Sequence, residues 1–110
     1  MALQLGKRKR AFTADMQVVW LDKAIHDLIM IKAYIQADNP AASKKVGRTI
    51  TEIATLLAQQ PEMGRLRPCG KVRELIIPGL PYILPYRIRK KDVQILRVLH
   101  TSRKWPYTLN

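Results

Sequence analysis

The side chains of this sequence that could take part in chemistry gather toward the C-terminus, where a phenol, an imidazole and several guanidinium groups recur. They are Tyr86, Arg87, Arg97, His100 and Arg103. Cleaving RNA without a metal requires a group that takes the 2′-hydroxyl proton, a group that protonates the leaving oxygen, and cations that stabilise the phosphorane. Tyr86, Arg87, His100 and Arg103 are therefore the catalytic candidates, on the condition that the protein is a ribonuclease.

A structural role competes with the catalytic one at each of these positions. Alternation along residues 82–89 places Leu84 and Tyr86 on one face of a strand, where a tyrosine serves equally well as a core aromatic. His100 stands at the end of a strand and suits a structural hydrogen bond, and the arginines can form a solvated face. Both interpretations of Tyr86 stay open at this point.

Other classes of enzyme find no support in the sequence. One cysteine, Cys69, and two widely separated histidines, His26 and His100, cannot close a zinc site. Neither a phosphate-binding glycine-rich loop nor a serine nucleophile motif is present. Cys69 is interpreted as an incidental loop thiol, because no histidine is near it in the sequence. We therefore expect neither a metal nor a cofactor.

The charge distribution indicates what the protein binds. Lys and Arg total 20 against 8 Asp and Glu, and residues 65–104 carry eleven of these bases with only Glu74 and Asp92 as acids. A surface with this excess attracts a polyanion or an acidic partner. The candidate residues for binding a target or an acidic protein are Arg65, Arg73, Arg87, Arg89, Arg97, Arg103 and Lys104.

Length and composition predict one domain in the cytoplasm. The 110 residues suffice for a single core, and the apolar fraction of 47% is that of a globular protein. A lone cysteine fits a reducing compartment, and no run has the length of a membrane span or the pattern of a signal peptide. Residues 1–15 hold a block of four bases and no apolar period, so we expect a flexible basic tail there.

Periodicity predicts the elements that must position the candidate residues. Residues 17–20 are typical of a strand, and apolar residues at helical spacing follow Asp22, the expected cap of a first helix. Asn39 and Pro40 have the residue types that begin a second helix, which is expected to end before Pro61. The short link between the two helices predicts an αα-hairpin.

Three strands are expected after a loop at residues 61–71, over residues 72–77, 82–89 and 93–100. Their links are short enough for antiparallel hairpins. Pro85 lies inside the middle strand and cannot donate to a ladder, which indicates a bulge or a locally unpaired edge. The expected fold class is α+β: an N-terminal strand, an αα-hairpin and a three-stranded antiparallel meander, with the helices packed on one face of the sheet.

Four short motifs follow one another through the C-terminal half. They are Arg73-Glu74-Leu75, Pro81-Tyr82-Ile83-Leu84-Pro85-Tyr86-Arg87-Ile88, Val93-Gln94-Ile95-Leu96-Arg97-Val98-Leu99-His100 and Arg103-Lys104-Trp105-Pro106. In this order they closely resemble the RelE/ParE superfamily of type II toxins. The resemblance covers residues 16–106, the expected single domain, and leaves the basic tail and a C-terminal tail at 107–110 outside.

The resemblance implies a small α+β toxin that is neutralised by a cognate antitoxin, a small, acidic and partly disordered protein. It also implies one of two mechanisms, because RelE-like members cleave mRNA on the ribosome, whereas ParE-like members lack this activity and inhibit DNA gyrase. RelE-like nucleases keep an arginine just before a Leu-Val-Tyr-like run, and here Ile83 holds that position. This favours the ParE-like mechanism, with RelE-like cleavage as the alternative. A passive RNA- or ribosome-binding module is the alternative of a different class.

Overall fold

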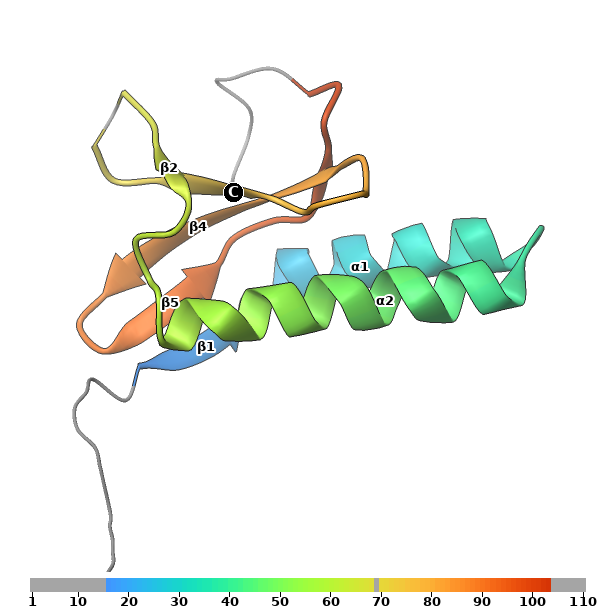
Figure 1. Cartoon of the computed structure of the whole chain (residues 1–110), viewed down its shortest axis with the longest axis horizontal. Coiled ribbons are helices and arrows are strands. Elements are labelled where there is room, and N and C mark those ends of the chain that lie inside the picture. The colour runs from blue at the N-terminus through green and yellow to red at the C-terminus, as the bar shows by residue number, and fades with distance from the viewer. Residues whose placement is uncertain (1–15, 69, 104–110) are drawn as a thin grey trace, which may run out of the picture.

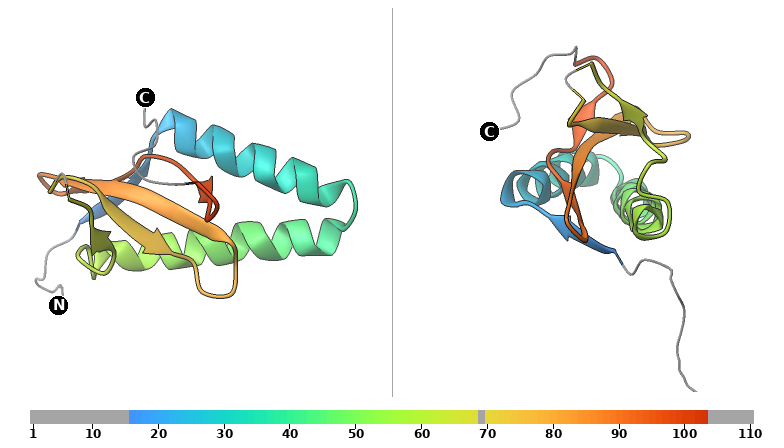
Figure 2. Two further views of the ribbon diagram at one scale, coloured as in Figure 1. Left: turned by 90° about the horizontal axis from the view of Figure 1, so that it is seen from above. Right: turned by 90° about the vertical axis from the view of Figure 1, so that its left-hand side faces the viewer.

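The computed structural model of the chain describes residues 16–68 and 70–103. β1 (Gln17–Trp20) leads into α1 (Asp22–Gln36) and α2 (Pro40–Thr55), and α2 is followed by a short 3-10 helix, η1 (Leu56–Ala58). The later strands are β2 (Arg65–Leu66), β3 (Arg73–Ile76), β4 (Tyr82–Arg89), β5 (Asp92–Ile95) and β6 (Leu99–His100). Figures 1 and 2 show the two helices side by side along the sheet, and the expected α+β fold class is confirmed. The tails expected at 1–15 and 107–110 lie outside the described residues.

The two helices form the expected αα-hairpin. Pro40 is the first residue of α2, and the Asn39 side chain caps this helix by accepting a hydrogen bond from the Ala42 N–H at 3.0 Å. The expected cap of α1 is wrong, because Asp22 is the first residue of the helix and not its cap. Its carboxylate still stabilises the first turn through the helix dipole. Within the described residues, neither helix is long and apolar enough to cross a membrane.

The expected three-stranded antiparallel meander is confirmed as β3, β4 and β5, and the sheet as a whole is mixed. Its strands run in the order β1-β5-β4-β3-β2, and β6 pairs with β4. β1 pairs in parallel with β5, so that Gln17 lies opposite Asp92 and Trp20 opposite Ile95. Alternation in a sequence fixes the face that a side chain takes, but it fixes neither the partner nor the direction of the strand.

The strand expected over residues 93–100 is divided in two by a bulge. Opposite β4, the two residues Leu84 and Pro85 face the three residues 96–98. Pro85 accepts a hydrogen bond from the Leu96 N–H at 2.8 Å but has no N–H to return, so regular pairing is interrupted here. The irregularity expected at Pro85 is present, and the extra residue belongs to the partner strand.

The central strand β4 separates two layers of side chains. Leu84 and Tyr86 are fully buried and belong to a core that includes Ile50 and Leu57, from α2 and η1. The alternate residues of β4 point to the opposite side of the sheet, which we call the outer face. Cross-strand pairing places Glu74, opposite Pro85, on this outer face as well.

The Tyr86 phenol ties the core to the loop before β2. Its hydroxyl donates to the Pro61 carbonyl oxygen at 2.7 Å and accepts from the Gly64 N–H at 2.8 Å. A Cβ atom at residue 64 would lie 2.6 Å from Cε1 of the Tyr86 ring and 2.9 Å from the Glu74 carbonyl oxygen, so this close approach requires glycine. Burial raises the pKa of Tyr86 above its ordinary value of 10.0, although the Gly64 N–H acts in the opposite direction.

Replacing Tyr86 by phenylalanine is expected to lower the free energy of unfolding by about 1–3 kcal/mol, because the buried Gly64 N–H and Pro61 carbonyl both lose their partner. Urea unfolding of the two proteins measures this difference. Tyr82→Phe is the matched control, since no hydrogen bond of the Tyr82 hydroxyl is seen within the described residues. An equal loss in both variants would contradict the proposed role of the Tyr86 hydroxyl.

The same tyrosine predicts a loss of stability in alkali. Below pH 10 the phenol is neutral in both states, so its contribution to stability is complete. Above pH 10 the unfolded state ionises first, and the free energy of unfolding falls with a slope of up to about 1.4 kcal/mol per pH unit until the folded-state pKa is passed. Unfolding measured between pH 8 and pH 11 should show a smaller slope in Tyr86→Phe, and identical slopes would contradict the raised pKa.

Candidate functional site

The structure does not bring the four predicted catalytic residues into one site. Tyr86 points to the helix side of β4, where its hydroxyl is bonded to the backbone. The neighbouring Arg87 points to the outer face, where its Nε donates to Oε1 of Gln94 at 2.7 Å. Side chains on opposite faces of a sheet cannot act on the same substrate atom. The geometry therefore supports Tyr86 as a core aromatic.

Two of the four, His100 and Arg103, do line one groove of about 370 Å³ between α1 and residues 97–103, together with Arg97, which was predicted to bind a partner. We call this hollow the α1 groove. The His100 ring is held in place, because its Nδ1 accepts from the Ser102 N–H at 3.0 Å and its plane meets the Tyr82 ring edge-on at 5.9 Å. A structural hydrogen bond, one of the two roles considered for His100, is thus observed.

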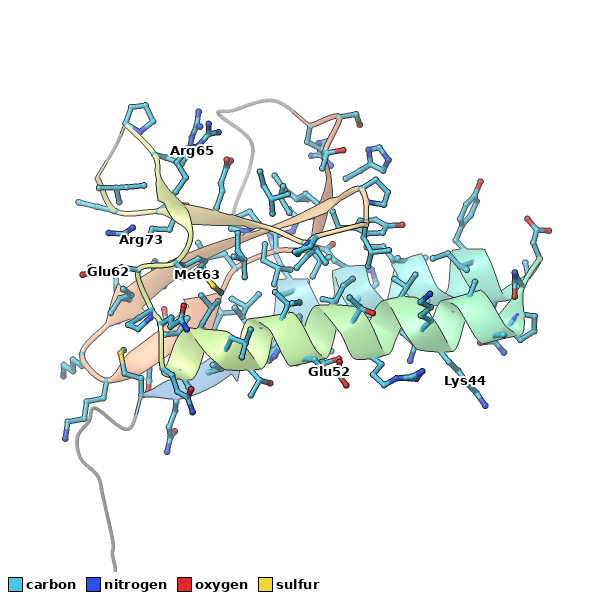
Figure 3. All side chains as sticks on the ribbon, in the orientation of Figure 1. Lys44, Glu52, Glu62, Met63, Arg65 and Arg73 are labelled. Atoms are coloured by element: carbon cyan, nitrogen blue, oxygen red, sulfur yellow. The ribbon has the colours of Figure 1, made fainter. Side chains whose placement is uncertain are left out.

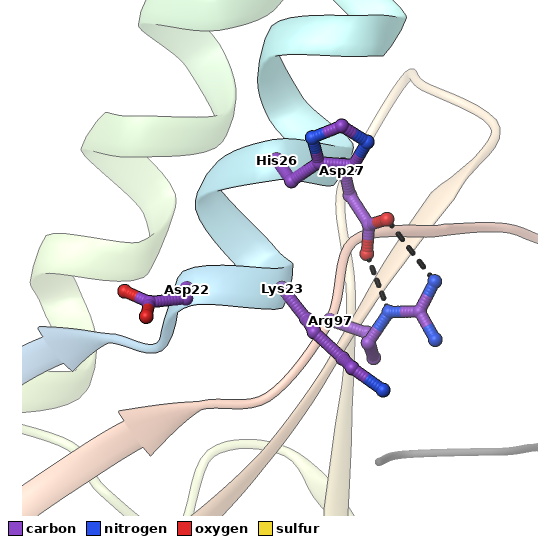
Figure 4. A pocket seen from close by; sticks show the side chains of 5 residues that line it. All are labelled: Asp22, Lys23, His26, Asp27 and Arg97. Atoms are coloured by element: carbon purple, nitrogen blue, oxygen red, sulfur yellow. Dashed lines mark hydrogen bonds and ion pairs between the residues drawn. The ribbon is translucent and has the colours of Figure 1, made fainter.

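An ion pair between α1 and the bulge lies in this groove. Asp27 accepts from Nε of Arg97 at 2.7 Å and from Nη2 at 3.1 Å, and the same carboxylate accepts from the Val98 N–H at 3.0 Å. Figure 4 shows the pair beside a second hollow, which is lined by Asp22, Lys23 and His26 as well. Hydrogen bonding to Asp27 raises the pKa of Arg97 above its ordinary value. Asp27 therefore holds the bulge and the arginine against the helix.

Apolar side chains of α1 stand beside this charged pair. Met30 and Tyr34 line the α1 groove and are 55% and 83% exposed. Exposed large apolar residues next to cations are typical of a protein-docking surface. The α1 groove can hold an amphipathic segment that offers apolar side chains to α1 and acidic side chains to Arg103 and, at the adjoining hollow, to Lys23.

The other cations predicted to bind a partner are spread over the sheet. Arg65 is on β2, with its Nη2 atom 3.4 Å from Oε1 of Glu74, and Arg89 is exposed at the end of β4. Arg73 is committed to the fold, because its Nη1 donates to the carbonyl oxygens of Glu62 at 3.3 Å and Gly64 at 2.9 Å (Figure 3). Lys104 lies outside the described residues.

No metal centre is seen within residues 16–68 and 70–103. No three side chains of the His, Cys, Asp or Glu types are near enough to one another there to hold an ion. His26 is exposed on α1 and His100 is exposed on β6, and Cys69 lies outside the described residues.

Sequence reasoning gave Asp27 no role, although it is the residue that organises the groove. A signal for it exists in the spacing, because Asp27 lies three residues after the buried Ala24 and four before Ile31, which packs against the core. A carboxylate on the inner stripe of a helix has to find a partner. Naming Arg97 as that partner required the fold, since the two residues are 70 positions apart in the chain.

Comparison with known proteins agrees with this architecture. The profile described as ParE toxin of type II toxin-antitoxin system, parDE, matches residues 18–105. The chain is 39% identical to Y4kP of Sinorhizobium fredii, named as a candidate toxin, over 93 residues that cover 84% of this chain and 96% of that protein. It is 36% identical to the toxin RelE2 of Caulobacter vibrioides over 87 residues, 79% of this chain and 97% of that one.

A solved structure, the chromosomal ParDE TA system from P. aeruginosa, contains a similar chain. The two share 28% sequence identity with a TM-score of 0.73, over 80% of this chain and 98% of the other. The profile match spans the described elements from β1 to β6, so the likeness is not confined to one motif. The protein therefore belongs to the ParE toxin family of type II toxin–antitoxin systems, and its partner is a cognate antitoxin.

Proposed function

We propose that this toxin arrests growth by binding DNA gyrase and blocking it, without cutting RNA. The separation of the predicted catalytic residues carries the proposal. Tyr86 is buried in the core, Arg87 points to the outer face, and His100 and Arg103 lie in the α1 groove. A ribonuclease needs its proton donor, proton acceptor and cations around one phosphate, whereas blocking an enzyme by contact needs only a complementary surface.

Ile83 supports the same mechanism. It is buried on the outer face, opposite Leu99 of β6, at the position where RelE-like nucleases keep an arginine. An aliphatic side chain there supplies neither a proton nor a charge to a phosphorane. The cationic outer face can still contact the acidic surface of an enzyme through Arg65, Arg87 and Arg89.

RelE-like cleavage is the second candidate, and one observation favours it. Arg97, His100 and Arg103 share the α1 groove, so an imidazole and two guanidinium groups are available to one ligand. A relative of the chain also carries the name RelE2. Passive binding of RNA, the candidate of a different class, would leave growth unaffected.

The same proposal assigns the α1 groove to the antitoxin. An acidic, partly disordered segment would order on the toxin by laying apolar side chains against Met30 and Tyr34, while its carboxylates approach Lys23 and Arg103. The charge excess of the toxin, +12, supports fast association that weakens as salt is added.

Two assays on the purified full chain separate the mechanisms. We expect inhibition of gyrase supercoiling and intact mRNA in a translating ribosome reaction. Codon-spaced cuts that disappear in Arg103→Ala would establish cleavage instead, because removing one charged donor costs about 10²–10³ in rate. Induced expression must also stop growth, and unchanged growth with soluble, folded protein present would leave only the passive module.

A further inference from the structure

A further hollow lies on the outer face of the sheet, and it shares only Arg103 with the α1 groove that we assign to the antitoxin. Its volume is about 210 Å³, and its charged lining comes from β2 and the residue after it, from β3 and from the residues that follow β6. We call it the outer pocket. Its lining includes Arg65, Arg67, Glu74, Ile76, Ile83 and Arg103.

The outer pocket has more positive than negative charge. Glu74, only 8% exposed, has its Oε1 atom 3.4 Å from Nη2 of Arg65 and 3.7 Å from Nη1 of Arg67. Among the described residues that line the outer pocket, three are arginines and Glu74 is the only acid. This excess of positive charge attracts an anion.

Two of the three arginines are available to that anion. The Arg65 side chain is 69% exposed, and its contact with Glu74, at 3.4 Å, is long for a charge-assisted hydrogen bond. The Arg103 side chain is exposed and makes no ion pair or side-chain hydrogen bond with any described residue. Both can turn toward a ligand at little cost, because neither is held by a strong contact.

The walls of the outer pocket favour an acidic side chain over a nucleic-acid backbone. Ile76 and Ile83 supply an aliphatic surface that suits the methylene stem of a glutamate. A polynucleotide would need an unbroken track of cations. On this face the track is interrupted, because the acid Asp92 pairs in register with Arg89 and Arg87 is bonded to Gln94. We propose that the outer pocket binds the carboxylate of an aspartate or glutamate side chain presented by a protein partner.

Because Arg65 also belongs to the face that we propose contacts gyrase, this inference deepens the proposed function, but it can be tested without gyrase or antitoxin. The probe is N-acetylglutamate amide, a capped glutamate with one negative charge, added to the ¹⁵N-labelled full chain. NMR signals of the arginine Nε–H groups report on individual arginines. We expect saturable shifts of the Arg65 and Arg103 signals, and no shift with N-acetylglutamine amide, which has the same shape without the charge.

Variants and a second anion complete the test. Arg65→Gln and Arg103→Gln should each weaken binding of the probe about two- to fivefold, as exposed ion pairs do. Arg89→Gln, on the same face but outside the outer pocket, should leave it unchanged. Absence of saturable shifts, or equal weakening by Arg89→Gln, would overturn the proposal. Tighter binding of dimethyl phosphate, a phosphodiester of the same charge, would overturn it in favour of a nucleic-acid site.

Discussion

Replacing Asp27 by alanine is expected to lower the free energy of unfolding by about 2–4 kcal/mol, the largest effect of any single side chain outside the apolar core. The carboxylate accepts three hydrogen bonds, two from Arg97 and one from the Val98 N–H. Both partners of the ion pair are largely buried, so its removal leaves a guanidinium and a backbone amide with little access to water. Guanidinium chloride unfolding of the purified variant measures the loss.

Two further variants separate the charge from the hydrogen bonds. Asp27→Asn keeps one carbonyl acceptor and is expected to lose less stability than Asp27→Ala. The double variant Asp27→Ala with Arg97→Ala removes both charges and should recover part of the loss, since no uncompensated guanidinium remains. A loss below about 1 kcal/mol in Asp27→Ala would show that the pair behaves as a surface ion pair.

Replacing Met30 by glutamate is expected to weaken the affinity for the cognate antitoxin by about 30-fold to 1,000-fold, the range of an interface hot spot. Met30 lines the α1 groove, and a carboxylate there would meet the apolar side chains of the antitoxin without a partner. Because Met30 is 55% exposed on a helix, the fold should tolerate the change. Isothermal titration of the co-expressed antitoxin onto the purified toxin measures the affinity.

The neighbouring residue provides a matched control. Ile29 is on the same helix and is 58% exposed, but it does not line the α1 groove. Ile29→Glu therefore changes the charge and the exposed apolar area as Met30→Glu does, and it should leave the antitoxin affinity within about threefold. Equal weakening by both variants would mean that the antitoxin contacts α1 in a different way.

The sequence predicted those parts of the fold that depend on local signals. The second helix begins at Asn39 and Pro40 as expected, because a capping side chain and a proline in the first turn act within a few residues. The strand over residues 82–89 has the expected bounds, since its alternation is set by its own side chains. The parallel pairing of β1 with β5 was missed because strand partners are chosen by distant parts of the chain.

The types of residue in the candidate site could be predicted from the sequence, but which of them lie together in the fold could not. Alternation placed Tyr86 and Arg87 on opposite faces of one strand, and the structure confirms this placement. The carbonyl of Pro61 that accepts from the Tyr86 hydroxyl lies 25 residues away in the chain, so no local pattern indicated it. The approach of Arg97 to Asp27 likewise depends on the bulge, which redirects residues 96–98 toward α1.

Because the bulge joins residues 97–98 to α1, it also determines how late in the synthesis of the chain the α1 groove can form. The α1 groove needs Asp27 from the start of the domain and Arg97 from its end, and these residues are made 70 codons apart. At about 5–20 residues per second, a ribosome takes roughly 4–14 s to pass from one to the other. During that time α1 and α2 can pair, because their contacts are local. If the α1 groove binds the antitoxin, as we propose, neutralisation is expected to act on finished molecules and not on nascent chains, because the groove is complete only when residues 97–103 have docked.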